Sequence, residues 1–136
     1  MQEAENERMH LMIFIEFARP TGPRRPIIYG GFLPPAPAPR RTAHRLVGDF
    51  DEEAVLSYTQ SIKVIAGRSP KVAAAPIARR YWKLTGDATL RDVVLVVRVD
   101  EAHHRHVNHG LANQLSGEPA NPAPAAPYPP HADSAL

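Results

Sequence analysis

The 136-residue chain contains no cysteine. This absence excludes disulfides, zinc sites built from thiolates, iron–sulfur clusters and any control of activity through cysteine oxidation. The metal ligands that remain are the carboxylates of aspartate and glutamate and the imidazole of histidine. For a metal-binding chain, this ligand set suits iron or manganese.

Long apolar runs are also missing. No run approaches the roughly 18 to 20 residues that a membrane-spanning helix requires, so we expect a chain that does not cross a bilayer but is able to lie on its surface. A signal peptide is not expected, because the apolar stretch LMIFIEFA is short and follows an acidic start. The net charge is only +2 and the basic residues form no dense block, which gives nucleic-acid binding little support.

The 15 prolines concentrate in residues 20–39 and 119–130. Because proline interrupts a continuous helix, we expect an irregular connection over residues 20–41 and a disordered, proline- and alanine-rich tail over 116–136. The remaining sequence has the length of one domain at most, within residues 1–115.

Helical patterns fill the rest of the chain. Thr42 is the expected N-cap of one helix and Asp87 that of another. The β-branched run at 92–97 could be read as a buried strand, but its helix-forming neighbours and a 3.6-residue periodicity favour helix. We therefore predict an all-α chain with about three helices, at 3–18, 42–66 and 88–115, and a short helical turn at 76–84.

A glutamate followed three residues later by a histidine occurs twice, as Glu7 with His10 and as Glu101 with His104. Residues three apart lie on one face of a helix, a turn apart, so each pair can converge on one point. Two such pairs in one small chain suggest a carboxylate-bridged metal pair held between helices.

The apolar stripes of the two longer helices are interrupted by acids. A buried unpaired carboxylate costs several kcal/mol, so acids on such stripes usually face a cation. For Asp51 the cation could instead be an arginine, such as Arg98 or Arg8. The first stripe comprises Val47, Asp51, Ala54, Val55, Tyr58, Ile62 and Ile65, and the second Leu90, Val94, Val97, Glu101, His104, Asn108 and Leu111 or Ala112.

Each of these residues also has an ordinary interpretation. A single glutamate–histidine pair is most often a solvated helix face, and it is the recurrence on apolar stripes that favours metal. Tyr58 is either a core aromatic with a hydrogen-bonded hydroxyl or a relay for an electron and a proton. Core packing is favoured for Tyr81 and Trp82. Within the cluster His103, His104, His106 and His109, only His104 shares the face of Glu101.

Three segments resemble the alternative oxidases, the di-iron ubiquinol oxidases of respiratory membranes. They are NERMHL at 6–11, DEEAVLSYT at 51–59 and YWKLTGDATLRDVVLVVRVDEAHHRHVNH at 81–109. The resemblance implies a ferritin-like four-helix bundle that lies monotopically on a mitochondrial or bacterial inner membrane. It further implies cyanide-resistant oxidation of ubiquinol and reduction of oxygen to water without proton pumping; a homodimer is left open.

By motif position, the resemblance also implies roles for individual residues. Two iron ions would be held by Glu7, Asp51 and Glu101, with His10 and His104 close to them. Tyr58 matches the redox-active tyrosine of the family. The surrounding hydrogen-bond network corresponds to Asn6, Tyr81, Trp82 and Asp100, and the quinol pocket to Glu53 and Ser57.

The chain departs from the family pattern in several places. Asp51 replaces a glutamate and shortens that ligand by one methylene, Val99 interrupts the usual RADEAHH, and His106 replaces an aspartate. The glutamate that precedes NERMH in the family has no counterpart here, which predicts an incomplete bundle. Three functions therefore stay open: a ubiquinol oxidase, an inactive truncated remnant with weak or no metal binding, and a soluble iron handler that does not use quinol.

Overall fold

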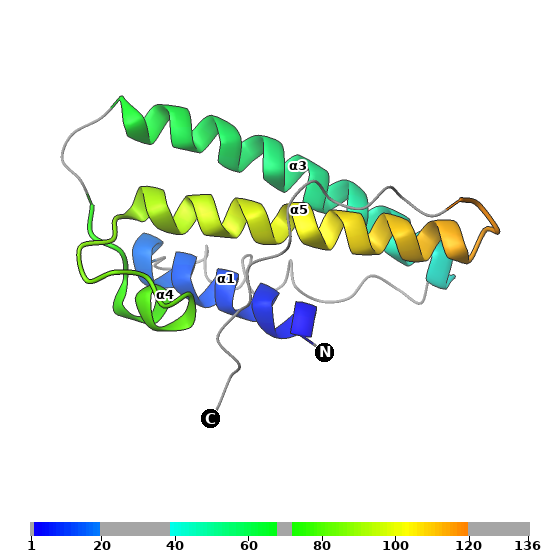
Figure 1. The fold of residues 1–136 in the computed structure, drawn as a ribbon, viewed down its shortest axis with the longest axis horizontal. Coiled ribbons are helices and arrows are strands. Elements are labelled where there is room, and N and C mark those ends of the chain that lie inside the picture. The colour runs from blue at the N-terminus through cyan, green and yellow to red at the C-terminus, as the bar shows by residue number, and fades with distance from the viewer. Residues whose placement is uncertain (1, 20–38, 68–71, 120–136) are drawn as a thin grey trace. The chain divides into compact units, whose positions relative to one another are not determined.

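The computed structural model describes residues 2–19, 39–67 and 72–119, and all elements in these ranges are helices. No strand forms within these ranges; a single isolated bridge joins Ala73 to Thr89. The prediction of an all-α chain is confirmed. The helices are α1 (Gln2–Ala18), α3 (Arg40–Ala66), α4 (Pro76–Tyr81) and α5 (Leu90–Gln114), shown in Figure 1.

The chain divides into two compact units, Met1–Pro39 and Arg40–Leu136. In the first unit, α1 has neither glycine nor proline, and Arg19 ends it with a positive φ of 41°. The amide of Arg19 donates to the carbonyl of Ile15 at 2.9 Å. One face of α1 is buried at intervals of three and four residues, at Asn6, Met9, His10 and Ile13.

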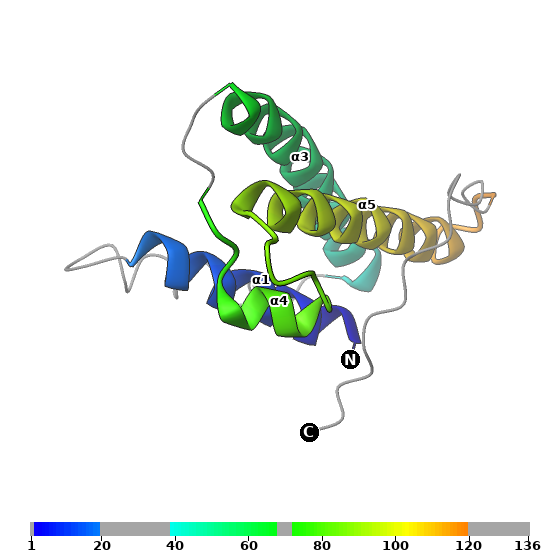
Figure 2. The same cartoon turned by 60° about the vertical axis from the view of Figure 1, so that its left-hand side comes forward.

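In the second unit, α3 and α5 run antiparallel and side by side, as Figures 1 and 2 show from two directions. Their close approach depends on Gly48, because a Cβ placed there would lie 2.8 Å from Cε1 of His109. Arg45 adds a hydrogen bond of 2.8 Å to Oδ1 of Asn113. Glycine and paired polar groups thus hold the two helices together near the start of α3 and the end of α5.

The start of α5 is capped by a residue other than the expected Asp87. The carboxylate of Asp92 accepts hydrogen bonds from the backbone amide of Thr89, at 2.8 Å, and from its hydroxyl, at 2.7 Å. Threonine at the N-cap with an acid three residues later is the capping-box arrangement, so Thr89 holds the N-cap position. Thr42 is likewise not an N-cap, because α3 begins two residues earlier, at Arg40.

The other predicted boundaries lie close to the observed ones. Residues 92–97 are helical, so the strand interpretation is wrong. Most of the expected irregular connection and of the tail, residues 20–38 and 120–136, lies outside the described residues. The first residues of the tail, 116–119, are described: residues 115–117 form a turn, and the amide of Glu118 donates to the carbonyl of Asn113 at 3.0 Å.

The buried face of α5 matches the predicted stripe, whereas that of α3 does so only in part. Val47 was expected to face inward but is 41% exposed, and Gly48 is buried instead. The reason is the close helix approach at Gly48, which turns this residue and Asp51 toward α5. Within the described parts of the chain, no helix combines the length and apolar character needed to cross a bilayer.

Candidate metal centre

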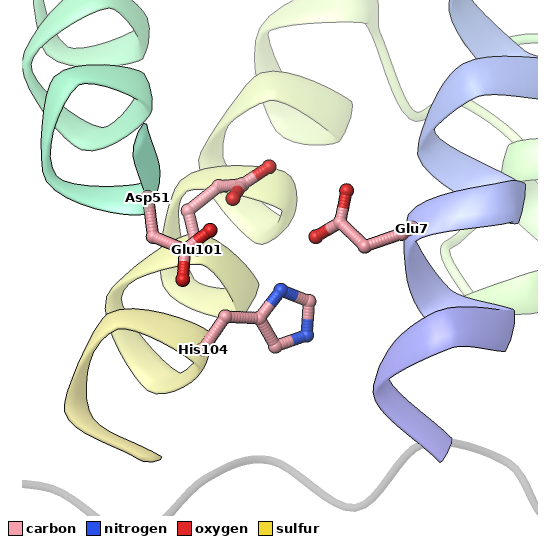
Figure 3. A group of neighbouring side chains, drawn as sticks. All are labelled: Glu7, Asp51, Glu101 and His104. Atoms are coloured by element: carbon pink, nitrogen blue, oxygen red, sulfur yellow. The ribbon is translucent and has the colours of Figure 1, made fainter. Parts of the chain in front are cut away.

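Three ionisable side chains of the second unit gather between α3 and α5. They are Asp51, Glu101 and His104, whose ligand atoms lie within 4.8 Å of one another. All three are buried, with exposed fractions of 7%, 5% and 2%. Figure 3 shows the two carboxylates and the imidazole ring pointing into the same space.

The local structure explains why these residues meet. Glu101 and His104 are three residues apart on α5 and therefore share a face, one turn from each other. Asp51 lies on the antiparallel α3, one turn after Gly48, where the His109 ring of α5 packs against the backbone of α3. The sequence pattern predicts the first arrangement, but the second depends on how the helices pack.

Two carboxylates and an imidazole fit a transition metal. Oxygen and nitrogen donors of this kind suit iron and manganese, and burial of two acids side by side is costly unless a cation compensates. The donors come from two long helices that pack directly on each other, so their positions are set by the fold rather than by a loop. The chemistry of the donor set therefore agrees with the iron implied by the resemblance.

Asn108, which the sequence placed on the buried stripe without a role, joins the cluster through hydrogen bonds. Its Nδ2 donates to Oδ2 of Asp51 at 3.3 Å and to the carbonyl of His104 at 3.1 Å. Its Oδ1 lies 2.9 Å from Nδ1 of His44 on α3. His44 was missed entirely, because nothing in the spacing of one histidine on the Arg40–Ala66 segment signals a partner 64 residues away.

The other glutamate–histidine pair lies on α1, in the first unit. Nδ1 of His10 is 3.9 Å from Oε1 of Glu7, so the two side chains share one face as expected. His10 is 3% exposed and Asn6 only 2%, whereas the side chain of Glu7 is 35% exposed. Two of the expected ligands and one residue of the expected network are therefore grouped on a single helix.

One hydrogen bond beside α5 joins two residues of the expected network. Nε1 of Trp82 donates to Oδ2 of Asp100 at 3.1 Å. The rings of Tyr81 and Trp82 meet edge to face, with centroids 5.1 Å apart and planes at 80°. Asp100, which immediately precedes Glu101, is 1% exposed. The loop that follows α4 thereby anchors α5 next to a cluster carboxylate.

The remaining expected site residues all lie on α3. Tyr58 is partly buried and follows Asp51 by seven residues, which is two helical turns. Glu53 and Ser57 are exposed and stand one turn apart on another face of the helix. The structure thus separates the three residues into one that shares the side of Asp51 and two that do not.

Comparison with known proteins identifies the family. The sequence model of the family described as alternative oxidase matches residues 1–113. The chain is 45% identical to "Ubiquinol oxidase 1c, mitochondrial" of Arabidopsis thaliana, over 92% of this chain and 41% of the relative. It is 48% identical to "Ubiquinol oxidase 2, mitochondrial" of Nicotiana tabacum, over 80% and 39%.

A fungal relative gives the same result. "Alternative oxidase, mitochondrial" of Emericella nidulans is 42% identical over 95% of this chain and 42% of the relative. The chain therefore spans about two fifths of the length of the relatives that it matches. Because the family model covers most of the chain, and because the acids and the histidine of the buried cluster fall inside the match, this chain belongs to the alternative oxidase family.

Proposed function

We propose that the chain functions as a di-iron ubiquinol:oxygen oxidoreductase. The observation that carries this proposal is the buried cluster of Asp51, Glu101 and His104, found in a chain whose relatives are named ubiquinol oxidases. Two ubiquinol molecules would each give up two electrons and two protons. One oxygen molecule would accept all four electrons and all four protons and leave as two water molecules.

Two iron ions would be held by side chains from three helices. Asp51 on α3 and Glu101 with His104 on α5 form one part of the ligand set. Glu7 and His10 on α1 form a second part, since their spacing repeats that of Glu101 and His104. When bound, iron supplies the one-electron chemistry and the oxygen binding that amino-acid side chains lack.

The protein groups would hold the reactants and move protons and electrons. Tyr58 would lend one electron and one proton during reduction of oxygen, because a phenol is able to give up both, and ubiquinol would return them. Trp82 would fix the carboxylate of Asp100 and so the adjacent turn of α5 that carries Glu101. Glu53 and Ser57 would meet the quinol head group, one as proton acceptor and one as hydrogen-bond donor.

A respiratory membrane, mitochondrial or bacterial, would be the site of action, since ubiquinol is dissolved in the bilayer. Exposed apolar side chains on α3 support contact with a membrane surface. Phe50 is 64% exposed, and Leu56 and Val64 are 53% and 52% exposed. Transfer of such side chains from water to the lipid boundary lowers the free energy.

The direct experiment measures iron and turnover in the same preparation. We expect the purified chain, loaded with Fe(II) without oxygen and returned to membranes, to consume oxygen with ubiquinol in the presence of cyanide. The variant Glu101→Ala should lose both iron and turnover. Iron-dependent oxygen uptake that ubiquinol does not affect would indicate an iron handler, and iron at background would indicate an inactive remnant; either result contradicts the proposal.

A further inference from the structure

Asn108 lies on α5 one turn after His104, and its side chain is almost fully buried, with 4% exposure. Three of the groups that its amide contacts lie on α3 or α5. Nδ2 donates to Oδ2 of Asp51 at 3.3 Å and to the carbonyl of His104 at 3.1 Å. Oδ1 pairs with Nδ1 of His44 at 2.9 Å. One amide therefore connects a carboxylate of the candidate metal centre to a histidine outside it.

The chemistry of the partners fixes the orientation of this amide. An ionised carboxylate and a backbone carbonyl accept hydrogen bonds and donate none. The NH₂ group of Asn108 must therefore face Asp51 and His104, because the opposite orientation would bring its oxygen against two acceptors. Its oxygen then faces His44, so the imidazole must donate from Nδ1. The proton position on His44 thus follows from the neighbours of Asn108.

Because of where its two partners lie on α3, Asn108 cross-links α5 to α3 at two points. His44 and Asp51 are seven residues apart, which is two turns of helix, and so they lie on the same face. Asn108 projects from α5 and bonds to both of them. Rotation of its amide would break the bond to His44 as well as the bond to Asp51, so each hydrogen bond holds the other in place.

We propose that Asn108, oriented by His44, is a positioning residue that sets the direction of the Asp51 carboxylate toward a bound metal. This inference rests on the proposed metal centre. With Oδ2 of Asp51 held by the amide, the carboxylate reaches the metal already oriented, and less conformational freedom is lost on binding. Groups that orient metal ligands in this way commonly change metal affinity by about 10- to 100-fold when they are removed.

The test measures binding of Co(II) to the full-length chain without oxygen, by titration of the visible absorbance of the metal. Asn108→Leu keeps the volume of the side chain and removes the amide, and we expect Co(II) affinity to fall about 10- to 100-fold. His44→Phe should lower affinity to a smaller extent. His44→Asn should restore it, since the amide nitrogen of asparagine is able to take the place of Nδ1.

A matched control lies on the same helix. Asn113 also bonds across to α3, through Arg45 at 2.8 Å, and it is not one of the clustered residues. Asn113→Leu should therefore leave Co(II) affinity unchanged. An equal loss of affinity in Asn108→Leu and Asn113→Leu would overturn the proposal, because it would assign the effect to helix packing in general.

A combined variant shows whether Asn108 acts through Asp51. Once Asp51→Ala has removed the carboxylate, adding Asn108→Leu should change Co(II) affinity no further, whereas a second full loss would overturn the inference. NMR of the metal-free protein gives an independent measurement: the His44 ring should carry its proton on Nδ1 in the wild type and lose this preference in Asn108→Leu. Wild-type protein that binds no Co(II) would refute the metal centre itself, while tight binding unaffected by Asn108→Leu would refute only the positioning role.

Discussion

Asp51→Asn separates the stability of the metal-free protein from its ability to bind metal. The substitution keeps the shape of the side chain and still offers an oxygen to the amide of Asn108, but removes the charge of one of the two carboxylates in the buried cluster. Ligand atoms of Asp51 and Glu101 lie within 4.8 Å of each other. At an effective dielectric constant of about 20, two unit charges at that distance repel by about 3 kcal/mol.

We therefore expect the metal-free variant to be more stable than the wild type, by about 1 to 3 kcal/mol. Added metal should act in the opposite direction and should narrow or reverse this difference in stability. A ligand present at 100 times its dissociation constant stabilises the folded state by about 2.7 kcal/mol. The wild type should gain this amount with Mn(II) or anaerobic Fe(II), and the variant should gain almost none.

Urea unfolding, followed by helical circular dichroism with and without metal, measures both effects. Asp49→Asn is the matched control, since Asp49 is on the same helix two residues away and its side chain is 61% exposed. Asp49→Asn should change neither the stability of the metal-free protein nor the stabilisation by metal by more than a few tenths of a kcal/mol. The reasoning fails if Asp51→Asn destabilises the metal-free protein, or if metal stabilises this variant as much as the wild type.

Three further outcomes follow from the described contacts. Gly48→Ala should destabilise the folded protein by about 1 to 2 kcal/mol, because overlap with the His109 ring outweighs the helix preference for alanine. In a His109→Ala background the same substitution should stabilise the protein instead. Urea unfolding that shows equal effects in both backgrounds would contradict this prediction. Thr89→Ala removes the hydroxyl of the α5 cap and should lower the free energy of unfolding by about 1 kcal/mol. A urea midpoint equal to that of the wild type would contradict this prediction. The Arg8 guanidinium lowers the pKa of Glu5. The stabilisation from this pair is therefore present above the ordinary glutamate pKa and is lost as the pH falls through the lowered pKa, and Glu5→Gln should remove this small pH dependence of stability. An NMR titration of Glu5 that is unchanged in Arg8→Ala would refute the assignment of the shift to Arg8.

The sequence predicted the elements whose signals are local. The helix α5 and its buried face followed from a 3.6-residue stripe, and Glu101 with His104 followed from the spacing of three. The position of Asp51 in the cluster was also expected, since it is the one acid on the apolar face of α3. These features depend on helical periodicity alone, which is readable from residues close together in the chain.

Features that depend on contacts between distant residues could not be predicted. Gly48 rather than Val47 faces α5, because the His109 ring requires the room that a side chain would occupy there. The role of His44 results from a partner on another helix. The N-cap was misplaced at Asp87 because both Asp87 and Thr89 are good capping residues, and only the position of the Asp92 carboxylate decides between them.

The central claim is that acids buried between the helices are there to hold iron. Anaerobic titration of the purified chain with Fe(II), followed by removal of loose metal and iron analysis, tests it directly, with Glu101→Ala as the comparison. We expect two iron ions per wild-type chain and a clear loss in the variant. Iron at the same background level in both proteins would contradict the claim, whatever the similarity of the sequence to its relatives.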